Sequence, residues 1–446
     1  LLDLAVLFEE YGRAALNGPM LGTVMGTLAI LAGGSEERKA ERLPQVVAGQ
    51  RVWTFAMEEP EVAYDPRCVA VRAVCTDQGY ASPFGGATGP TAWIAPGVVS
   101  VYALSFTLWG CFTFKSILFV FLVSLMVSLV TTAVVFRIGE RVASDPNVGF
   151  LAALFFACLP YEASVFKIAG HLDFNLQVLW FAVLLLAVLR AMDSERPLSG
   201  LDLGAVSAVA ALFNPGLLLC TGVGSLFAMR GRSRQEINRF AVHLACAHIV
   251  ILGPYAVFQG VRMGGFIPVK SNAGFELYLG NTREARGVLH NVAFQAYHPS
   301  QNATEFVYYG RVGELAYVSE AESHFREDFR VGDFFRNTVR RVFYFFFAYE
   351  VRPWDPSPWF STMKAVMWAV PVLSLIGLVV VRRGRPAATE SAVLLFTLAY
   401  ATPYLLTGVM DRYRIPMVSA VALALALLTW TLIETWRGHE IGRKGL

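Results

Sequence analysis

The sequence predicts an all-α polytopic membrane protein with about ten transmembrane helices. Apolar runs of membrane-spanning length follow one another from Phe114 to Leu432. The chain is 55% hydrophobic and only 16% charged, with a mean hydropathy of +0.50, which is too apolar for an ordinary soluble domain. Arginine is concentrated in every second connection between the apolar runs.

The individual spans follow from helix geometry. A helix rises about 1.5 Å per residue, so about 20 residues cross the roughly 30 Å hydrocarbon core of a bilayer. The stretch 202–229 is long enough for two short spans, broken at Asn214-Pro215-Gly216. Residues 19–34 form a weaker first span, and the aromatic run 95–112 either crosses the membrane or lies along its interface. The remaining runs are 114–136, 147–162, 172–189, 240–258, 363–381, 391–408 and 414–433.

The distribution of cations predicts the orientation of these spans. Lysine and arginine near the ends of spans stay in the cytoplasm. The short connections on one side hold only Lys167, Arg412 and Arg414. We therefore expect both termini in the cytoplasm and this sparsely charged side outside. The opposite side holds fourteen cations: Arg137, Arg141, Arg190, Arg196, Arg230, Arg232, Arg234, Arg239, Arg382, Arg383, Arg385, Arg437, Arg443 and Lys444.

This orientation divides the chain into five segments. Two long outer loops contain short helices, and they place the candidate site at the outer membrane face. Within the second loop, Arg340 and Arg341 precede the aromatic run Phe343–Phe347, which indicates an amphipathic segment at headgroup level. The segments are 1–34 (cytoplasmic N-terminus and first span), 35–112 (first outer loop with an interfacial helix), 113–258 (transmembrane bundle), 259–360 (second outer loop) and 361–446 (C-terminal transmembrane helices and cytoplasmic tail).

Several functional classes lack their sequence signals. No basic patch interleaves with aromatic residues outside the spans, so we expect no nucleic-acid partner. The six cysteines show no metal-binding spacing, and there is no phosphate-binding glycine loop or HExxH pattern. No cofactor is firmly implied. A divalent metal stays open at the acidic cluster of Glu58, Glu59, Glu61 and Asp65, where nothing specifies one.

Two carboxylates on the predicted outer side are candidates for a catalytic base. Asp65 precedes the membrane-proximal loop, and Asp173 lies beside His171 at the start of a span. An ionisable residue at the membrane edge is a functional-site hypothesis by default. The alternatives are a solvated loop acid for Asp65 and ordinary capping of a helix N-terminus for Asp173.

Cations on the same side are candidates for binding a phosphate. Arg412 and Arg414 depart from the charge bias, which favours a ligand over topology as the reason for their presence. Arginine binds phosphate oxygens with two donors at once, whereas Lys270 would act as a point charge. The alternative is pairing of the arginines with Asp411 or with lipid headgroups. Together with His171, the residues Asn272 and Glu276 complete the predicted substrate-binding set.

The order of these motifs resembles a known family. An acid in the first outer loop is followed by SPFGGATGPTAW and an AP-containing helix, and later by HLD, KSNAGFELYLGN, HPSQNATEF with GELAY, and DRYRIP. From around residue 61 to the C-terminus this pattern is similar to the bacterial membrane glycosyltransferases of the GT-C superfamily, in particular the dolichyl-phosphate-mannose–protein mannosyltransferase group. The family typically carries an acidic pair at the end of the first outer loop, where this chain has the single acid Asp65 before Pro66.

The resemblance implies an inverting sugar transfer at the outer face of a bacterial cytoplasmic (inner) membrane. The donor would be a sugar linked to polyprenyl phosphate, and the acceptor a lipid, glycan or protein. The rival interpretation is a transporter or flippase for a lipid-linked or small polar substrate, which would use ionisable residues within spans and broken helices. His243, His248 and the break at Asn214-Pro215-Gly216 are the features that bear on it.

Overall fold

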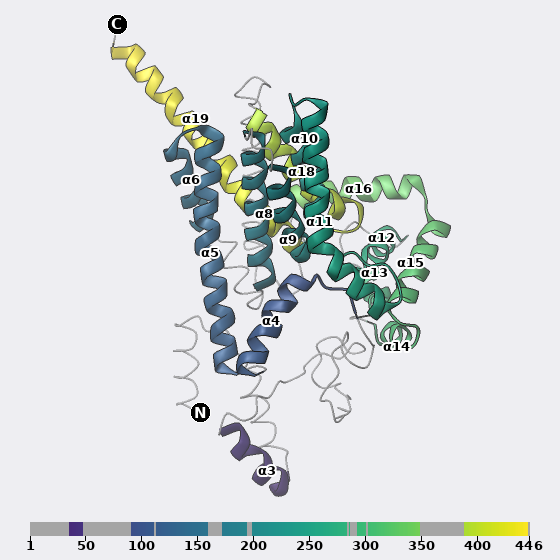
Figure 1. The fold of residues 1–446 in the computed structure, drawn as a ribbon. Coiled ribbons are helices and arrows are strands. Elements are labelled where there is room, and N and C mark those ends of the chain that lie inside the picture. The colour runs from purple at the N-terminus through teal and green to yellow at the C-terminus, as the bar shows by residue number, and fades with distance from the viewer. Residues whose placement is uncertain are drawn as a thin grey trace. The chain divides into compact units, whose positions relative to one another are not determined.

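The computed structural model describes residues 35–47, 91–110, 113–158, 172–193, 199–282, 285, 292–299, 302–347 and 388–444. Every regular element in these ranges is a helix, which confirms the predicted all-α class (Figure 1). Contacts divide the chain into two units. The first comprises Leu1–Tyr80, Val101–Val123 and Phe166–Gly170, and the second comprises Ala81–Ser100, Ser124–Val165 and His171–Leu446.

In the first unit, α3 spans Glu36–Val47 and two apolar helices meet in a reversal of the chain. The helix α4, Pro96–Trp109, ends here, and α5, Phe114–Ala143, begins here. Gly110 makes the turn possible because its φ of 83° lies in the left-handed region. Ser105 Oγ then donates to the carbonyl of Ser116 at 3.1 Å, which fixes the pairing of the two helices. Whether α4 crosses the membrane or lies along it stays a prediction.

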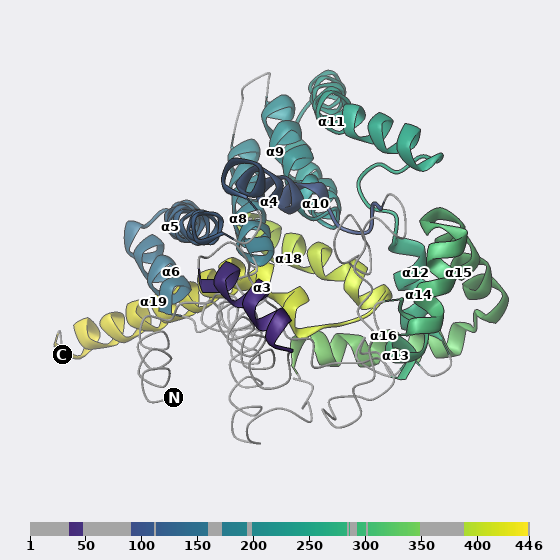
Figure 2. The same ribbon diagram turned by 90° about the horizontal axis from the view of Figure 1, so that it is seen from below.

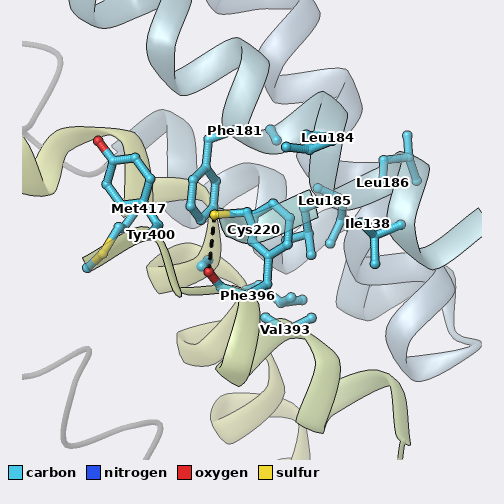
Figure 3. Packing of buried hydrophobic residues seen from close by; sticks show 14 of the residues in the cluster. Ile138, Phe181, Leu184, Leu185, Leu186, Cys220, Val393, Phe396, Tyr400 and Met417 are labelled. Atoms are coloured by element: carbon cyan, nitrogen blue, oxygen red, sulfur yellow. Dashed lines mark hydrogen bonds between the residues drawn. The ribbon is translucent and has the colours of Figure 1, made fainter. Parts of the chain in front are cut away.

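The second unit contains a helical bundle centred on α8. This helix contacts α9, α10, α18 and α19, and its side chains Phe181, Leu184 and Val188 are fully buried. Figure 3 shows this core, with Phe181 edge-on to Phe396 at 5.1 Å between ring centroids. The bundle helices are α6 (Pro146–Cys158), α8 (Leu172–Met192), α9 (Ser199–Phe213), α10 (Leu217–Met229), α11 (Arg234–Met263), α18 (Ala388–Leu406) and α19 (Val418–Lys444), and the 3₁₀ turn η2 (Asp411–Met417) precedes α19.

Four helices in the described ranges are long and apolar enough to cross a membrane: Phe114–Ala143, Leu172–Met192, Arg234–Met263 and Arg412–Trp436. The helices α4, α6, α9 and α10 are shorter but also apolar. This composition fits a helical membrane protein. The predicted spans 19–34 and 363–381 lie outside the described residues, so the total of about ten spans stays a prediction.

The predicted break at Asn214-Pro215-Gly216 is a reversal between two antiparallel helices. The helix α9 ends at Phe213 and α10 begins at Leu217. The hydroxyl groups of Ser207 on α9 and Thr221 on α10 form a hydrogen bond between the two helices. Arg232, which follows α10, donates to Ser199 Oγ at the start of α9 at 3.1 Å. The chain therefore forms an ordinary helical hairpin here. The break consequently gives no support to the broken-helix feature of a transporter.

His248 binds this hairpin to α11. Its Nε2 lies 3.0 Å from Ser207 Oγ, and its Nδ1 lies 2.8 Å from the carbonyl oxygen of Leu244 one turn earlier. Both ring nitrogens thus have protein partners. This arrangement gives His248 a structural role between apolar helices, as hydrogen-bonding side chains often have in membrane bundles.

The arginines of the bundle connections that the structure describes share one end. Arg141, from the end of α5, forms an ion pair with Asp193 after α8 at 2.9 Å. Arg232, between α10 and α11, donates to the carbonyl of Ala191 at 3.0 Å. The helix α8 is 21 residues long, and Asp173 lies in its first turn, at the opposite end. These described arginines therefore lie at the end of the bundle opposite Asp173. Which side of the membrane each end faces stays a prediction.

Five further helices of the second unit lie beside the bundle when it is seen from below (Figure 2). They correspond to the short helices predicted in the second outer loop. Their core is aromatic: Trp93, from the segment before α4, packs against Phe275 and Tyr309, and Phe275 against Tyr317. The helices are α12 (Ala273–Asn281), α13 (Val292–Tyr297), α14 (Ala303–Val312), α15 (Glu314–Asp328) and α16 (Val331–Phe346).

Candidate functional site

Asp173 begins a chain of polar contacts that runs into the bundle. Gln177 Nε2, one turn along α8, donates to Asp173 Oδ1 at 2.9 Å. Asn214 Nδ2, in the α9–α10 turn, donates to Gln177 Oε1 at 2.9 Å and to the hydroxyl of Tyr404 at 3.0 Å. Four residues of helix correspond to about 6 Å of rise, so the Gln177 level lies one turn deeper than the carboxylate. This series of hydrogen bonds fixes the orientation of the Asp173 carboxylate from the side of the bundle interior.

Lys270 lies within electrostatic reach of three charged side chains. These are Glu276 on α12, Asp173 on α8 and Arg412 on η2. Because the three come from separate parts of the sequence, only the fold brings them together. The predicted residues Asp173, Lys270, Glu276 and Arg412 thus form one charged cluster at the end of the bundle opposite the arginine-rich connections.

Burial shifts Lys270 and Glu276, two members of this cluster, toward their neutral forms. Loss of water raises the pKa of Glu276, although Lys270, Arg412 and a hydrogen bond from Asn272 Nδ2 at 3.1 Å favour the carboxylate. Loss of water likewise lowers the pKa of Lys270, which the nearby carboxylates only partly offset. The protonation of both groups would therefore respond to a further charge placed beside them.

His298 is a neutral member of the same neighbourhood. Its side chain is buried and lies edge-on to Trp93 and to Phe275, with ring centroids 5.8 and 5.6 Å apart. Burial and, to a smaller extent, the positive charge of Arg412 lower the pKa of His298 to about 4. In the sequence, His298 stands out only as part of the polar stretch HPSQNATEF. The electrostatic effect of Arg412 on His298 acts between segments more than a hundred residues apart in the sequence.

The arginines of η2 have different environments. Arg412 is exposed and its guanidinium lies over the ring of Tyr413, 5.6 Å from the centroid. Tyr413 stacks in turn on Tyr404 at 4.6 Å. Arg414 is fully buried and donates to the carbonyls of Tyr344 and Phe345 near the end of α16. This geometry makes Arg414 a link between η2 and α16, whereas the guanidinium of Arg412 stays exposed.

A buried carboxylate holds the Lys270 segment in place. Glu314, at the start of α15, accepts hydrogen bonds from the Thr91 hydroxyl, from the Ala92 backbone N–H at 2.8 Å, from the Ser271 hydroxyl and from the Tyr309 hydroxyl at 2.7 Å. Ser271 N–H also donates to the carbonyl of Ala92 at 3.2 Å. Glu314 therefore joins the predicted first and second outer loops, next to Lys270. The sequence did not single it out because its partners are distant in the chain.

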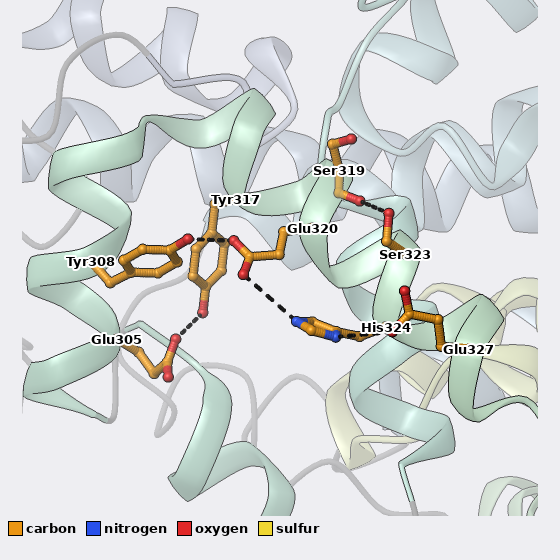
Figure 4. A network of polar contacts seen from close by, with 8 residues as sticks. All are labelled: Glu305, Tyr308, Tyr317, Ser319, Glu320, Ser323, His324 and Glu327. Atoms are coloured by element: carbon orange, nitrogen blue, oxygen red, sulfur yellow. Dashed lines mark hydrogen bonds and ion pairs between the residues drawn. The ribbon is translucent and has the colours of Figure 1, made fainter.

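A second polar network joins α14 and α15 (Figure 4). Tyr317 donates to Glu305 at 2.8 Å, Tyr308 donates to Glu320, and His324 lies 3.6 Å from Glu320. These groups satisfy one another, and we assign them to the packing of α14 on α15.

Two predicted site residues and the acidic cluster considered for a divalent metal lie outside the described ranges. Asp65, the first candidate base, and His171 are both in segments that the structure does not describe. The same holds for the acidic cluster at which a divalent metal stays open. Within the described ranges, no three His, Cys, Asp or Glu side chains are close enough to hold a metal ion.

Comparison of the chain with protein-family models, with curated proteins and with solved structures finds no match.

Proposed function

We propose that this protein is an integral membrane glycosyltransferase that moves a sugar from a polyprenyl-phosphate carrier to an acceptor at the outer face of the membrane. The observation that carries the proposal is the charged cluster itself. An oriented carboxylate, Asp173, and two cations, Lys270 and Arg412, meet at one end of an apolar bundle. A lipid-linked phosphate would reach this level from the bilayer. The motif resemblance described above points to the same chemistry.

The proposed reaction uses a carboxylate and the two cations of the cluster. The acceptor hydroxyl attacks the anomeric carbon, and its proton passes to a carboxylate as the new carbon–oxygen bond forms. The bond between that carbon and the phosphate oxygen breaks on the opposite side, so the configuration inverts. The bonding electrons stay with the departing phosphate, whose additional charge Lys270 and Arg412 stabilise. Asp173 and Asp65 are the candidate bases.

The experiment is a release assay on the purified full chain in vesicles. The donors are short-chain polyprenyl-phosphate hexoses and pentoses, supplied with membranes from a strain that lacks the chain as the acceptor source. Release of polyprenyl phosphate together with transfer of labelled sugar to the acceptor membranes is the expected result. Uptake of a solute into vesicles without sugar transfer would favour the transporter interpretation instead.

Variants separate the roles of the residues. If Asp173 is the base, Asp173→Asn should lower the transfer rate by about 10²–10⁴ at saturating donor, the usual contribution of a positioned base. Asp202→Asn is the matched control, because Asp202 also lies in the first turn of an apolar helix but is at the arginine-rich end. Arg412→Gln should mainly raise the donor KM, so saturating donor restores part of its activity. Full activity in both Asp173→Asn and Asp65→Asn would exclude the proposed bases.

A further inference from the structure

The helix α16 presents three kinds of surface around its axis. Its buried side chains Asn337, Arg341 and Phe345 face the protein. A second sector is apolar and exposed: Val331 is 72% exposed, Phe335 69%, Val339 53% and Phe343 57%. Since successive residues are about 100° apart around a helix, these four positions fall within a sector of about 120°. The third sector, next to Phe343, carries the exposed arginines Arg336 and Arg340.

The protein-facing sector fixes α16 to the end of the bundle. Arg341 donates to the carbonyl of Leu405, the penultimate residue of α18, at 2.7 Å. It also donates to the carbonyl of Gly280 at 2.6 Å and to Asn281 Oδ1 at 2.8 Å, at the end of α12. Phe345 stacks on Tyr404 with ring centroids 6.2 Å apart. The C-terminal end of α16 therefore lies beside the end of the apolar bundle helix α18, where the predicted span 391–408 also ends.

We propose that α16 lies on a membrane surface that contains anionic lipid, with its apolar sector in the boundary between headgroups and acyl chains. An interfacial helix combines a continuous apolar face with cations at its edge. The arrangement here has both features, and the arginine sector complements negatively charged lipid phosphates. Arg336 also pairs with Asp333 at 2.7 Å, so Arg340 is the arginine whose role is tested most cleanly.

The residues available for lipid contact on α16 differ from those that the sequence pattern predicts. The sequence pattern suggested Arg340 and Arg341 as the headgroup pair, but Arg341 turns into the protein and caps the end of α12. The exposed apolar sector also begins earlier, at Val331 rather than at Phe343. Because Arg341 joins α16 to the helix that carries Glu276, lipid contact along α16 would set the height of α12 above the membrane.

The test is photocrosslinking of the full chain in mixed vesicles of phosphatidylcholine and phosphatidylglycerol, with an alkyne tag on one lipid at a time. A benzophenone analogue of phenylalanine replaces Phe335 or Phe343. The matched control is Glu327 on α15, whose side chain is 75% exposed but lies outside the apolar sector. We expect lipid adducts at Phe335 and Phe343 in roughly tenfold excess over Glu327, because an interfacial apolar face is immersed by about 5–10 Å.

A charge variant tests the anionic component. Arg340→Gln in the Phe335 background should lower adducts to tagged phosphatidylglycerol by up to about fivefold and leave those to phosphatidylcholine nearly unchanged. Variants are compared only where their melting temperature equals that of the parent, and Phe343 stands in if the Phe335 variant does not fold. Equal lipid adducts at Glu327, no lipid adducts in folded variants, or crosslinks to a second copy of the chain would each overturn the proposal.

Discussion

At the scale of single residues, burial decides the charge states around the candidate site. Lys270 and Glu276 are both shifted toward neutrality by loss of water, and His298 is held neutral by burial and by Arg412. Charged groups that lack full solvation respond strongly to a new charge nearby. The charge states of the cluster should therefore change when a charged ligand binds.

His298 gives a pH dependence whose sign follows from proton binding. The folded pKa is about 4 and the usual value is 6.5, so between these values the unfolded chain binds a proton that the folded chain does not. Stability should therefore fall as pH drops through this window, by about 2 kcal/mol from neutral pH to pH 5. His298→Gln should remove this contribution. Melting temperatures of both proteins in micelles across the window measure it, and parallel curves would contradict the assignment.

At the scale of elements, close approach of helices depends on small residues. The contact between α9 and α11 is built on Gly204, where an added Cβ would lie 2.8 Å from the carbonyl of Leu244 and from the Cβ of Ala247. Gly280 on α12 is equally constrained, because an added Cβ would overlap the carbonyl of Thr407. Such contacts between backbones are typical of membrane helix packing. They set the spacing of the elements that carry the site.

A pair of glycine variants tests this packing. Gly204→Ala should lower stability by about 1–3 kcal/mol, because the methyl group forces α9 and α11 apart. Gly222→Ala on α10 is the control, since no atom lies within 4 Å of its added Cβ. It should leave stability unchanged or raise it by up to about 1 kcal/mol through helix propensity. Equal melting temperatures for the two variants would show that the α9–α11 contact relaxes freely.

At the scale of the whole molecule, the two ends of the bundle have different chemistry. Arg141, Arg190 and Arg232 gather at the end of α8 that holds Met192, around a cavity of about 730 Å³ that Arg141 and Arg190 line. Asp173 and the charged cluster occupy the other end. If the arginine-rich end faces the cytoplasm, as the retention of cations there predicts, the charged cluster faces the outside. That orientation agrees with the proposed use of a lipid-linked donor.

Reporter fusions test this orientation. A fusion after Ser300 should report the outside, whereas fusions after Arg232 and after Arg385 should both report the cytoplasm. An alkaline phosphatase and a fluorescent reporter at each position give complementary signals. The same side for Ser300 and Arg385 would overturn the orientation, and with it the location of the proposed site.

The sequence by itself determined the helical class, most helix positions and the segregation of arginine. These features follow from local periodicity and composition, which one segment of chain carries alone. It also named Asp173, Lys270, Glu276 and Arg412, which the fold brings together, because charges at apolar boundaries are conspicuous. Asp65 and His171, which it also named, lie outside the described residues.

Only the tertiary structure separated Arg412 from Arg414. Both lie in one short 3₁₀ turn, where side chains two positions apart point about 120° from each other, so one is exposed while the other is buried against α16. Tertiary structure also revealed Glu314, whose donors Thr91 and Ala92 are more than two hundred residues away. A hydrogen bond between such distant segments leaves no periodic signal in the sequence, because it exists only once the fold has brought them together.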